Sequence, residues 1–378
     1  MEHRNTYEAL ANLLRWSFTA LWEGRWPTHD HLGKPFEEGS LSYELAHGTG
    51  DLADGYFAVL WVIESDLDFL AVFWDFPRHT AAMPCAFCPC TNRHGGIPWY
   101  DFSLAPPAPW MTQFRDVQYM LDNHDLFPNA MYTIPGVTPM TVCIDWMHTK
   151  YLGTDQYFLG SVLWVLCNLL MDEGHNDTEN CKHLWTKIKR EYRARGTTSR
   201  YRMMKTNMFS SGSGGYPQLK GKAGCIHHLG PILRHIIQQR YNPDCAFQVA
   251  ILEALKSSEE LEEILSTYKD QFKFPNEVAE RFRDLCITHV KQQQELKDFS
   301  DYKIFNVTFK HHWLVHAGHR AQFQNPRMGW CFQGEDLMLK IREMTHPCTF
   351  GTKDEFVHKK LLSRNLRSID EAFSRVCL

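Results

Sequence analysis

The segment Thr141–Gly153 constrains the fold of this chain more than any other segment. It opens with the β-forming residues Thr141–Ile144, continues through Asp145 and His148, and leads into a long apolar helical pattern, Tyr157–Met171. Many α/β proteins place their ligand sites where a strand ends and a helix follows. We therefore predict that Asp145 and His148 lie beside a metal site at the carboxyl end of a strand.

Two further acids follow the same logic. Tyr56–Ile63 is a continuous apolar run of aromatic and β-branched residues, which predicts a strand buried on both faces, and Asp66 comes just after it. Glu335 begins a predicted helix behind Gly334. Carboxylates that meet from distant parts of a chain can hold two Mg²⁺ ions for phosphoryl transfer. The alternative is that each acid only caps a helix or sits in a turn.

The composition fits a globular protein large enough for two subdomains. The chain has 378 residues, of which 44% are hydrophobic and 22% charged. No apolar stretch reaches the roughly 18 residues of a membrane span, so no membrane partner is expected. Its 12 cysteines, without a secretory leader pattern, predict reduced intracellular thiols. Elements are predicted in the order mixed α/β, a large helical block, then strand and helix again.

Positive charge is concentrated between Lys182 and Arg240, where Glu191 is the single acid among thirteen Lys or Arg residues. Such a block can neutralise a polyanion, and DNA is the partner we predict, although a solvated helix face is the alternative. The predicted DNA-binding residues are Lys187, Lys189, Arg190, Arg193, Arg195, Arg200, Arg202 and Lys205.

Two short motifs contain soft metal ligands. Cys85, Cys88 and Cys90, with His94 behind them, could bind Zn²⁺, but the usual partner pair about ten to twenty residues away is absent. Small buried thiols that pack a loop are the alternative. His312 and His316 lie one helical turn apart and form a candidate metal pair. We favour a polar or phosphate-facing helix there, over a metal pair or a zinc-dependent hydrolase.

These motifs, in this order, resemble those of eukaryotic cut-and-paste transposases of the CACTA-type or a related group. Asp145-Trp-Met-His148 resembles the family's [Cys/Asp]-x-x-His signature, and Ile63–Asp68 resembles the strand that ends in its second catalytic aspartate. Pro84–Cys88 resembles the Pro-Cys-x-x-Cys element that follows. Lys310–His316 and Gly334–Asp336 resemble the last block, where the catalytic glutamate starts a helix.

The resemblance implies an RNase H-like mixed sheet interrupted by a large all-helical insertion. It implies Asp66 as second metal ligand, His148 as the signature histidine and Glu335 as third ligand, with Asp145 at the first position of the signature and Mg²⁺ or Mn²⁺ as the cofactor. No acid before Asp66 ends a clear strand, so we expect an N-terminally truncated copy. The implied domains are 1–170 and 301–378 for the two parts of the RNase H-like domain and 171–300 for the basic helical insertion.

The sequence thus predicts a transposon-derived, nuclear DNA-binding protein that forms homo-oligomers, and it leaves two versions of this protein open. In the first, the chain cleaves and transfers DNA strands by two-metal phosphoryl transfer. In the second, it is a catalytically inactive, domesticated copy that serves as a DNA- or protein-interaction module.

Overall fold

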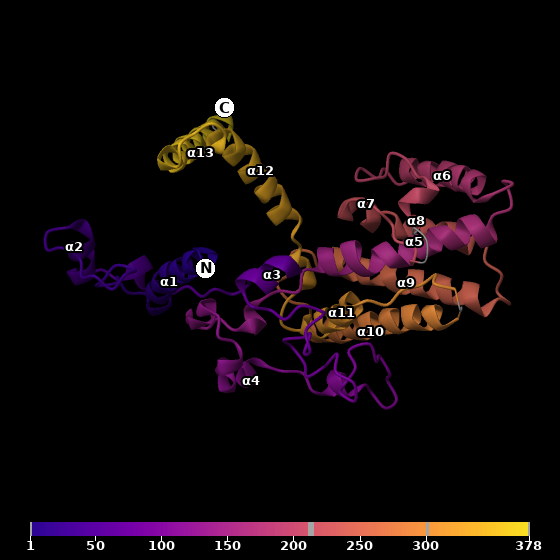
Figure 1. Ribbon diagram of the computed structural model, residues 1–378, viewed down its shortest axis with the longest axis horizontal. Helices are drawn as coiled ribbons and strands as arrows, with labels where there is room; N and C mark the ends of the chain where they lie inside the picture. Colours follow the sequence, from indigo (N-terminus) through magenta and orange to yellow (C-terminus); the bar gives the residue numbers. More distant parts are fainter. Residues whose placement is uncertain (1, 211–214, 300–301, 377–378) are drawn as a thin grey trace. The chain divides into compact units, whose positions relative to one another are not determined.

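The protein, seen here as a computed structural model, is mainly helical (Figure 1). The structure describes residues 2–210, 215–299 and 302–376. The α-helices are α1 (Glu2–Glu23), α2 (Leu41–His47), α3 (Leu67–Phe73), α4 (Val117–Asp122), α5 (Asp155–Val165), α6 (Asp177–Ala194), α7 (Ala223–His227), α8 (Gly230–Gln238), α9 (Ala246–Thr267), α10 (Asn276–Asp298), α11 (Phe309–Arg320), α12 (Phe332–Thr349) and α13 (Asp354–Val376). The predicted helix Tyr157–Met171 is confirmed, since α5 continues into the π-helical segment η7 (Leu166–Leu170).

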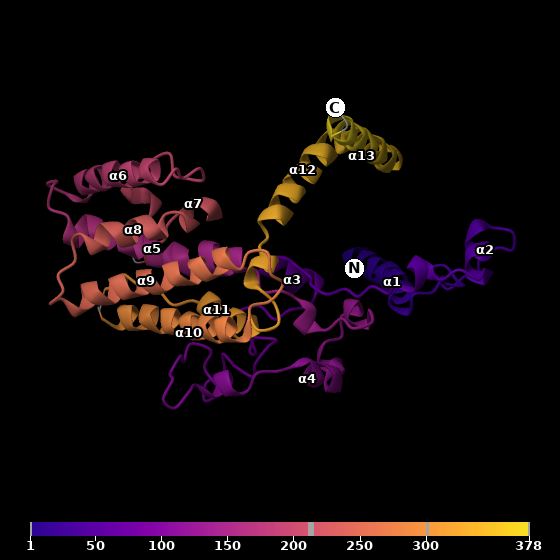
Figure 2. The same ribbon diagram turned by 180° about the vertical axis from the view of Figure 1, so that it is seen from behind.

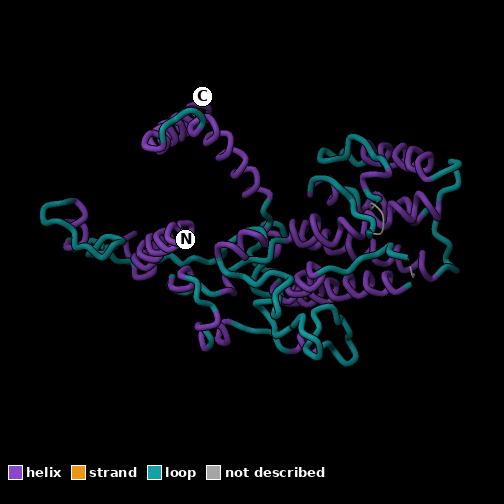
Figure 3. The backbone as a smooth tube through the Cα atoms, viewed as in Figure 1, coloured by secondary structure: helices purple, strands orange, loops and turns teal. Residues whose placement is uncertain are grey.

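The RNase H-like mixed sheet that we predicted is wrong. Helices make up 59% of the structure and strand or bridge residues 2%, and the part of the chain that is described contains no sheet (Figure 3). The two segments expected to be strands meet in one parallel bridge, between Ile63 and Val142. The backbone N–H of Ile63 donates to Thr141 O at 3.1 Å, and that of Cys143 donates to Ile63 O at 2.9 Å.

The physical reason is that strand-forming residues need neighbours on both sides to make a sheet. Tyr56–Ile63 runs extended but is not covered, because Tyr56, Phe57 and Trp61 are 78%, 73% and 64% exposed. The apolar run that we interpreted as a strand buried on both faces is therefore a surface segment with a single rung of pairing.

Two compact units divide the chain, Met1–Gly329 and Trp330–Leu378. In the first unit, α9 packs against α8 and α10, and α10 packs against α11 (Figures 1 and 2). The segment η6 (Met147–Thr154), which follows Asp145, packs against α5, α7 and α11. The second unit is the hairpin of α12 and α13. None of the described helices has the length and apolar character that a bilayer crossing demands.

A buried charge cluster joins η6 to α9 in the first unit. The ammonium group of Lys150 is fully enclosed, and it donates to Asp155 Oδ2 and Ser258 Oγ, each at 2.8 Å. It also lies 3.2 Å from Glu262 Oε1. Breaking such a pair typically costs about 3–5 kcal/mol, because the remaining charge is left buried without compensation.

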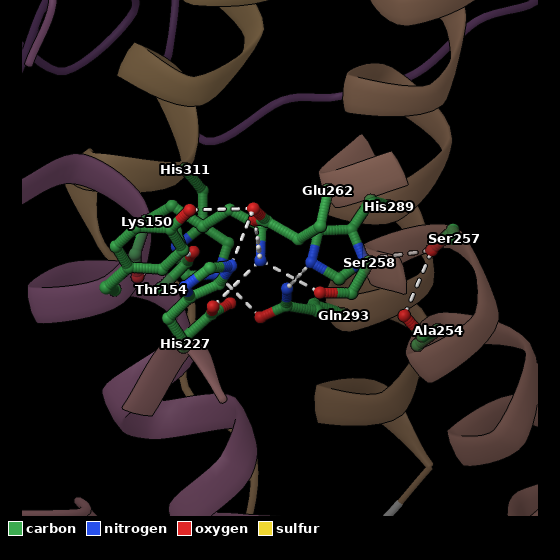
Figure 4. A network of polar contacts seen from close by, with 12 residues as sticks. Lys150, Thr154, His227, Ala254, Ser257, Ser258, Glu262, His289, Gln293 and His311 are labelled. Carbon is green, nitrogen blue, oxygen red and sulfur yellow. Dashed lines mark hydrogen bonds and ion pairs between the residues drawn. The ribbon is translucent and has the colours of Figure 1, made fainter. Parts of the chain in front are cut away.

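A chain of neutral polar groups continues from this cluster towards α11 (Figure 4). His289 on α10 bonds to Ser257 Oγ through Nδ1 at 2.9 Å and accepts from Gln293 Nε2 through its own Nε2 at 2.8 Å. Gln293 Oε1 in turn lies 3.0 Å from His311 Nε2. These bonds fix the rotation of α11 about its axis, and therefore the direction in which the next residue, His312, points.

Candidate metal centre

Four buried side chains from two distant segments meet in the first unit. Cys85 and Cys88 come from the loop after α3, and His312 and His316 come from α11. The four ligand atoms, two Sγ and two imidazole nitrogens, all lie within 4.8 Å of one another. His312 lies 224 positions beyond Cys88, so the fold brings together two half-sites that are unrelated by local spacing. The cluster can hold a metal ion.

The distances between these donor atoms are short and similar. Cys85 Sγ lies 3.4 Å from His316 Nε2, and Cys88 Sγ lies 3.3 Å from His312 Nε2. The two Nε2 atoms are 3.1 Å apart. Because His312 and His316 are one helical turn apart, both rings leave the same face of α11 and reach the same point. Neither ring reaches solvent, since these residues are 0% and 2% exposed.

Surrounding groups orient the ligands. His312 Nδ1 lies 3.1 Å from the carbonyl oxygen of Trp99, which can only accept, so Nδ1 carries the proton and Nε2 presents its lone pair to the cluster. The backbone N–H of Phe87 donates to Cys85 Sγ at 3.3 Å. Arg115 Nη1 donates to Ala86 O at 3.1 Å, which pins the loop that carries both cysteines. Such supporting bonds are typical of metal ligands held in advance of binding.

The pKa values of the two thiol ligands move in opposite directions: burial, and then the neighbouring Cys85 and Cys90, raise the pKa of Cys88 well above its usual range. Burial by itself raises the pKa of the Cys85 thiol, but hydrogen bonds from Cys88 and Cys90 and the nearby imidazoles bring it well below its usual range. Burial lowers the pKa of His316, which favours its neutral form. A thiolate and a neutral imidazole are the states in which these side chains bind metals.

A third cysteine lies next to the four-residue cluster. Cys90 is buried and its Sγ lies 3.6 Å from His312 Nε2, next to the four-residue cluster. His94, in contrast, is exposed. The pair that we missed near Cys85 and Cys88 is therefore His312 with His316.

Our preferred interpretation of His312 and His316, a polar or phosphate-facing helix, is corrected by their burial. The available signal was two incomplete half-sites, Cys-x-x-Cys and His-x-x-x-His, each lacking the partner that the other supplies. Because nothing in the local spacing links them, sequence reasoning treated them as separate motifs.

Asp145 and His148 do lie together, with their side chains in contact at the start of η6. The side chain of Asp145 is 3% exposed, and Oδ2 contacts His148 Nδ1. The backbone N–H of Met147 donates to Asp145 Oδ1 at 2.9 Å, and that of His148 donates to Oδ2 at 3.3 Å. The carboxylate thus caps the first turn of its own helical segment. The metal site predicted beside Asp145 and His148 stays a prediction.

The other two acids stand in different surroundings. Asp66 is exposed and caps α3, where Oδ1 accepts from Phe69 N at 2.7 Å. Glu335 lies in the first turn of α12, in the second unit, so its meeting with Asp66 stays a prediction. The acid that sequence reasoning passed over is Glu64, which follows the Ile63–Val142 bridge. Burial, and then the negative charge of Asp145, raises its pKa.

The predicted DNA-binding residues lie on α6 and on the segment after it. Seven of the eight are exposed, and the exception, Lys187, donates to Glu173 Oε1 at 2.8 Å. Leu184, Ile188 and Tyr192 are buried on the opposite side of α6, so its cations face outwards. Two further cations are partly compensated by Glu191, since Arg195 and Arg190 lie 3.7 Å and 4.0 Å from its carboxylate oxygens.

In comparisons with known proteins, no family model, curated protein or solved structure matches the chain.

Proposed function

We propose that the chain is a transposon-derived DNA-binding protein whose first unit is held together by a structural zinc ion. The observation that carries the DNA-binding part is the exposed cationic surface of α6 and residues 195–205. The zinc part rests on the buried cluster of Cys85, Cys88, His312 and His316. The transposon origin rests on the motif resemblance, in which the Cys-x-x-Cys and His-x-x-x-His elements are the two halves of this one cluster.

Zinc is the metal that suits these ligands best. Two thiolates and two imidazoles in a tetrahedron, at about 2.3 and 2.0–2.1 Å from the ion, place sulfur and nitrogen about 3.5 Å apart and the two nitrogens about 3.3 Å apart. The distances of 3.3–3.4 Å and 3.1 Å between the donor atoms are close to these values. Four protein ligands without solvent access favour a structural ion over a catalytic one, and so argue against a zinc hydrolase.

The α6 surface suits a phosphate backbone. Lys189, Arg190 and Arg193 lie on the exposed side of the helix, and Arg200, Arg202 and Lys205 extend the row beyond it. Tyr201 and Met204 are buried between them and anchor this segment. Six phosphate contacts would give binding that weakens steeply with salt, with a slope of about −5 in a plot of log affinity against log salt.

Filter binding of the full chain to duplex DNA over a range of salt concentrations tests the proposal. The variant Lys189→Gln/Arg190→Gln/Arg193→Gln should lower affinity about tenfold or more at low salt and make the slope shallower by about 3. The matched control, Lys269→Gln/Lys273→Gln/Lys297→Gln, removes the same charge from other exposed positions. Equal losses in both variants would contradict a specific role for α6. Elemental analysis should find about one zinc per chain.

A further inference from the structure

The second unit contains a hollow between its two helices. It has a volume of about 910 Å³, at the upper end of the range found for ligand sites, roughly 300–1,000 Å³. The lining includes Met344 from α12 and Phe356, Lys359, Lys360, Arg364 and Arg367 from α13. This site lies in the C-terminal unit and shares no residue with α6 or with the metal centre.

The charged residues that line this hollow are all cationic. Lys360, Arg364 and Arg367 follow the spacing i, i+4, i+7, so they share one face of α13 and span about 10 Å along it. All three side chains are exposed, and no acidic residue lines the hollow in the part of the hairpin that is described. Lys360 Nζ donates to Thr352 Oγ1 at 2.7 Å, which holds one cation at the rim.

Aromatic and apolar groups lie among these cations. The ammonium group of Lys359 lies 5.9 Å from the centre of the Phe356 ring, and that ring is 47% exposed. Cations beside accessible rings are the combination by which proteins hold unpaired nucleotides, because phosphates meet the charges while bases stack on the rings.

We propose that the hollow between α12 and α13 binds single-stranded nucleic acid. This inference rests on the proposed function and deepens it, because it adds a strand-binding site to the duplex-binding surface of α6. Phosphates lie along Lys360, Arg364 and Arg367, and a base stacks on Phe356. Recognition by charge and stacking tolerates any sequence.

A single strand fits this hollow better than the other polyanions. A duplex keeps its bases stacked inside, so its bases cannot stack on Phe356. An anionic membrane would take up the apolar side chains and cations of a single helix side by side. On α13 the strongly exposed Leu362 lies on the side opposite the three cations. It does not line the hollow, so the apolar side chain and the cations could not enter a membrane surface together.

Fluorescence anisotropy of the full chain with a labelled oligo(dT) strand tests this site. The variant Lys360→Gln/Arg364→Gln/Arg367→Gln should weaken strand binding about tenfold or more and make the salt slope shallower by about 2. Phe356→Leu should weaken it at least fivefold with an unchanged slope, since it removes stacking and leaves the charge. The control Lys269→Gln/Lys340→Gln/Arg342→Gln removes equal charge from exposed positions outside the hollow and should leave binding close to that of the parent chain.

The outcomes separate this inference from the proposed function. Loss of oligo(dT) binding in the α13 variant with duplex binding retained supports the strand site. If the α13 variant binds oligo(dT) as the parent does, or if the control loses as much affinity, the strand site is refuted. If the α13 variant loses only its binding to phosphatidylserine vesicles, the hollow is a membrane contact instead. A chain that fails to bind duplex DNA through α6 yet binds oligo(dT) through α13 overturns the proposed function alone.

Discussion

The metal centre and the start of η6 both began as short sequence motifs, and in the structure their side chains point in different directions. At the metal centre, donor atoms from Cys88 and His312 turn away from their own backbones and point to a shared position. At the start of η6, the carboxylate of Asp145 turns back and accepts from the N–H groups of Met147 and His148. The donors of the metal centre thus converge from distant parts of the chain, whereas the carboxylate of Asp145 accepts two hydrogen bonds from the backbone of its own helical segment.

The largest effect on zinc content and stability should come from removing one ligand of the metal centre. Cys88→Ser should lose the bound zinc and reduce the free energy of unfolding by more than about 4 kcal/mol, because loss of a structural metal belongs to the most damaging single changes. Zinc content by elemental analysis and urea unfolding measure the two effects. Cys225→Ser, at a half-buried cysteine outside the centre, should keep both near the parent values. A Cys88→Ser protein that retains zinc and stability would show that Cys88 is not a zinc ligand, and a parent chain without zinc would show that the cluster is only packed thiols.

A change at Asp145 should have a smaller effect on the unfolding free energy. Asp145→Asn keeps an oxygen for the capping bonds but removes the carboxylate oxygen that contacts His148 Nδ1, so we expect a loss of about 1–3 kcal/mol in unfolding free energy. Zinc content should stay unchanged, since Asp145 is outside the cluster of Cys85, Cys88, His312 and His316. A double-mutant cycle with His148→Ala isolates the pair. Additive effects of the two changes would mean that the contact contributes nothing to stability.

Mild acid should lower the unfolding free energy the least. This effect comes from the buried polar network around His289, and it involves neither the metal centre nor Asp145. Burial first, and then the charge of Lys150, lowers the pKa of His289 well below 6.5. The unfolded chain therefore binds a proton at His289 that the folded chain does not bind. Through this one group the unfolding free energy falls as the pH drops below about 6.5, by up to about 1.4 kcal/mol per pH unit.

A second fall should come at lower pH from Glu262. Burial raises its pKa, but Lys150 and His227 outweigh burial and bring it to about 2, so its contribution is full above about 4.5 and declines between 4.5 and 2. Urea unfolding between pH 7.5 and 5.5 measures the first fall. The variant His289→Gln should make this fall shallower by up to about 1.4 kcal/mol per pH unit. Burial also lowers the pKa of His311 to about 4 and that of His319 to about 3, so these groups keep part of the fall. An unchanged slope in the variant would assign the whole acid sensitivity to such other groups.

Local motifs were readable from the sequence wherever their cause is local. The Cys-x-x-Cys turn, the two histidines one turn apart on α11 and the Asp66 cap of α3 each depend on residues within a few positions. The same holds for the outward-facing cations of α6, because an amphipathic pattern fixes both faces of a helix at once. The long helix after Asp145 followed from its continuous apolar pattern.

Only the tertiary structure decided which motifs meet. It joined Cys88 to His312, brought Glu64 beside Asp145, and enclosed Lys150 between two carboxylates. It also left Tyr56–Ile63 without the neighbouring strands that would make a sheet. The physical reason is that backbone pairing and metal coordination need partners from elsewhere in the chain, and strand propensity or ligand type at one segment carries no information about where those partners lie.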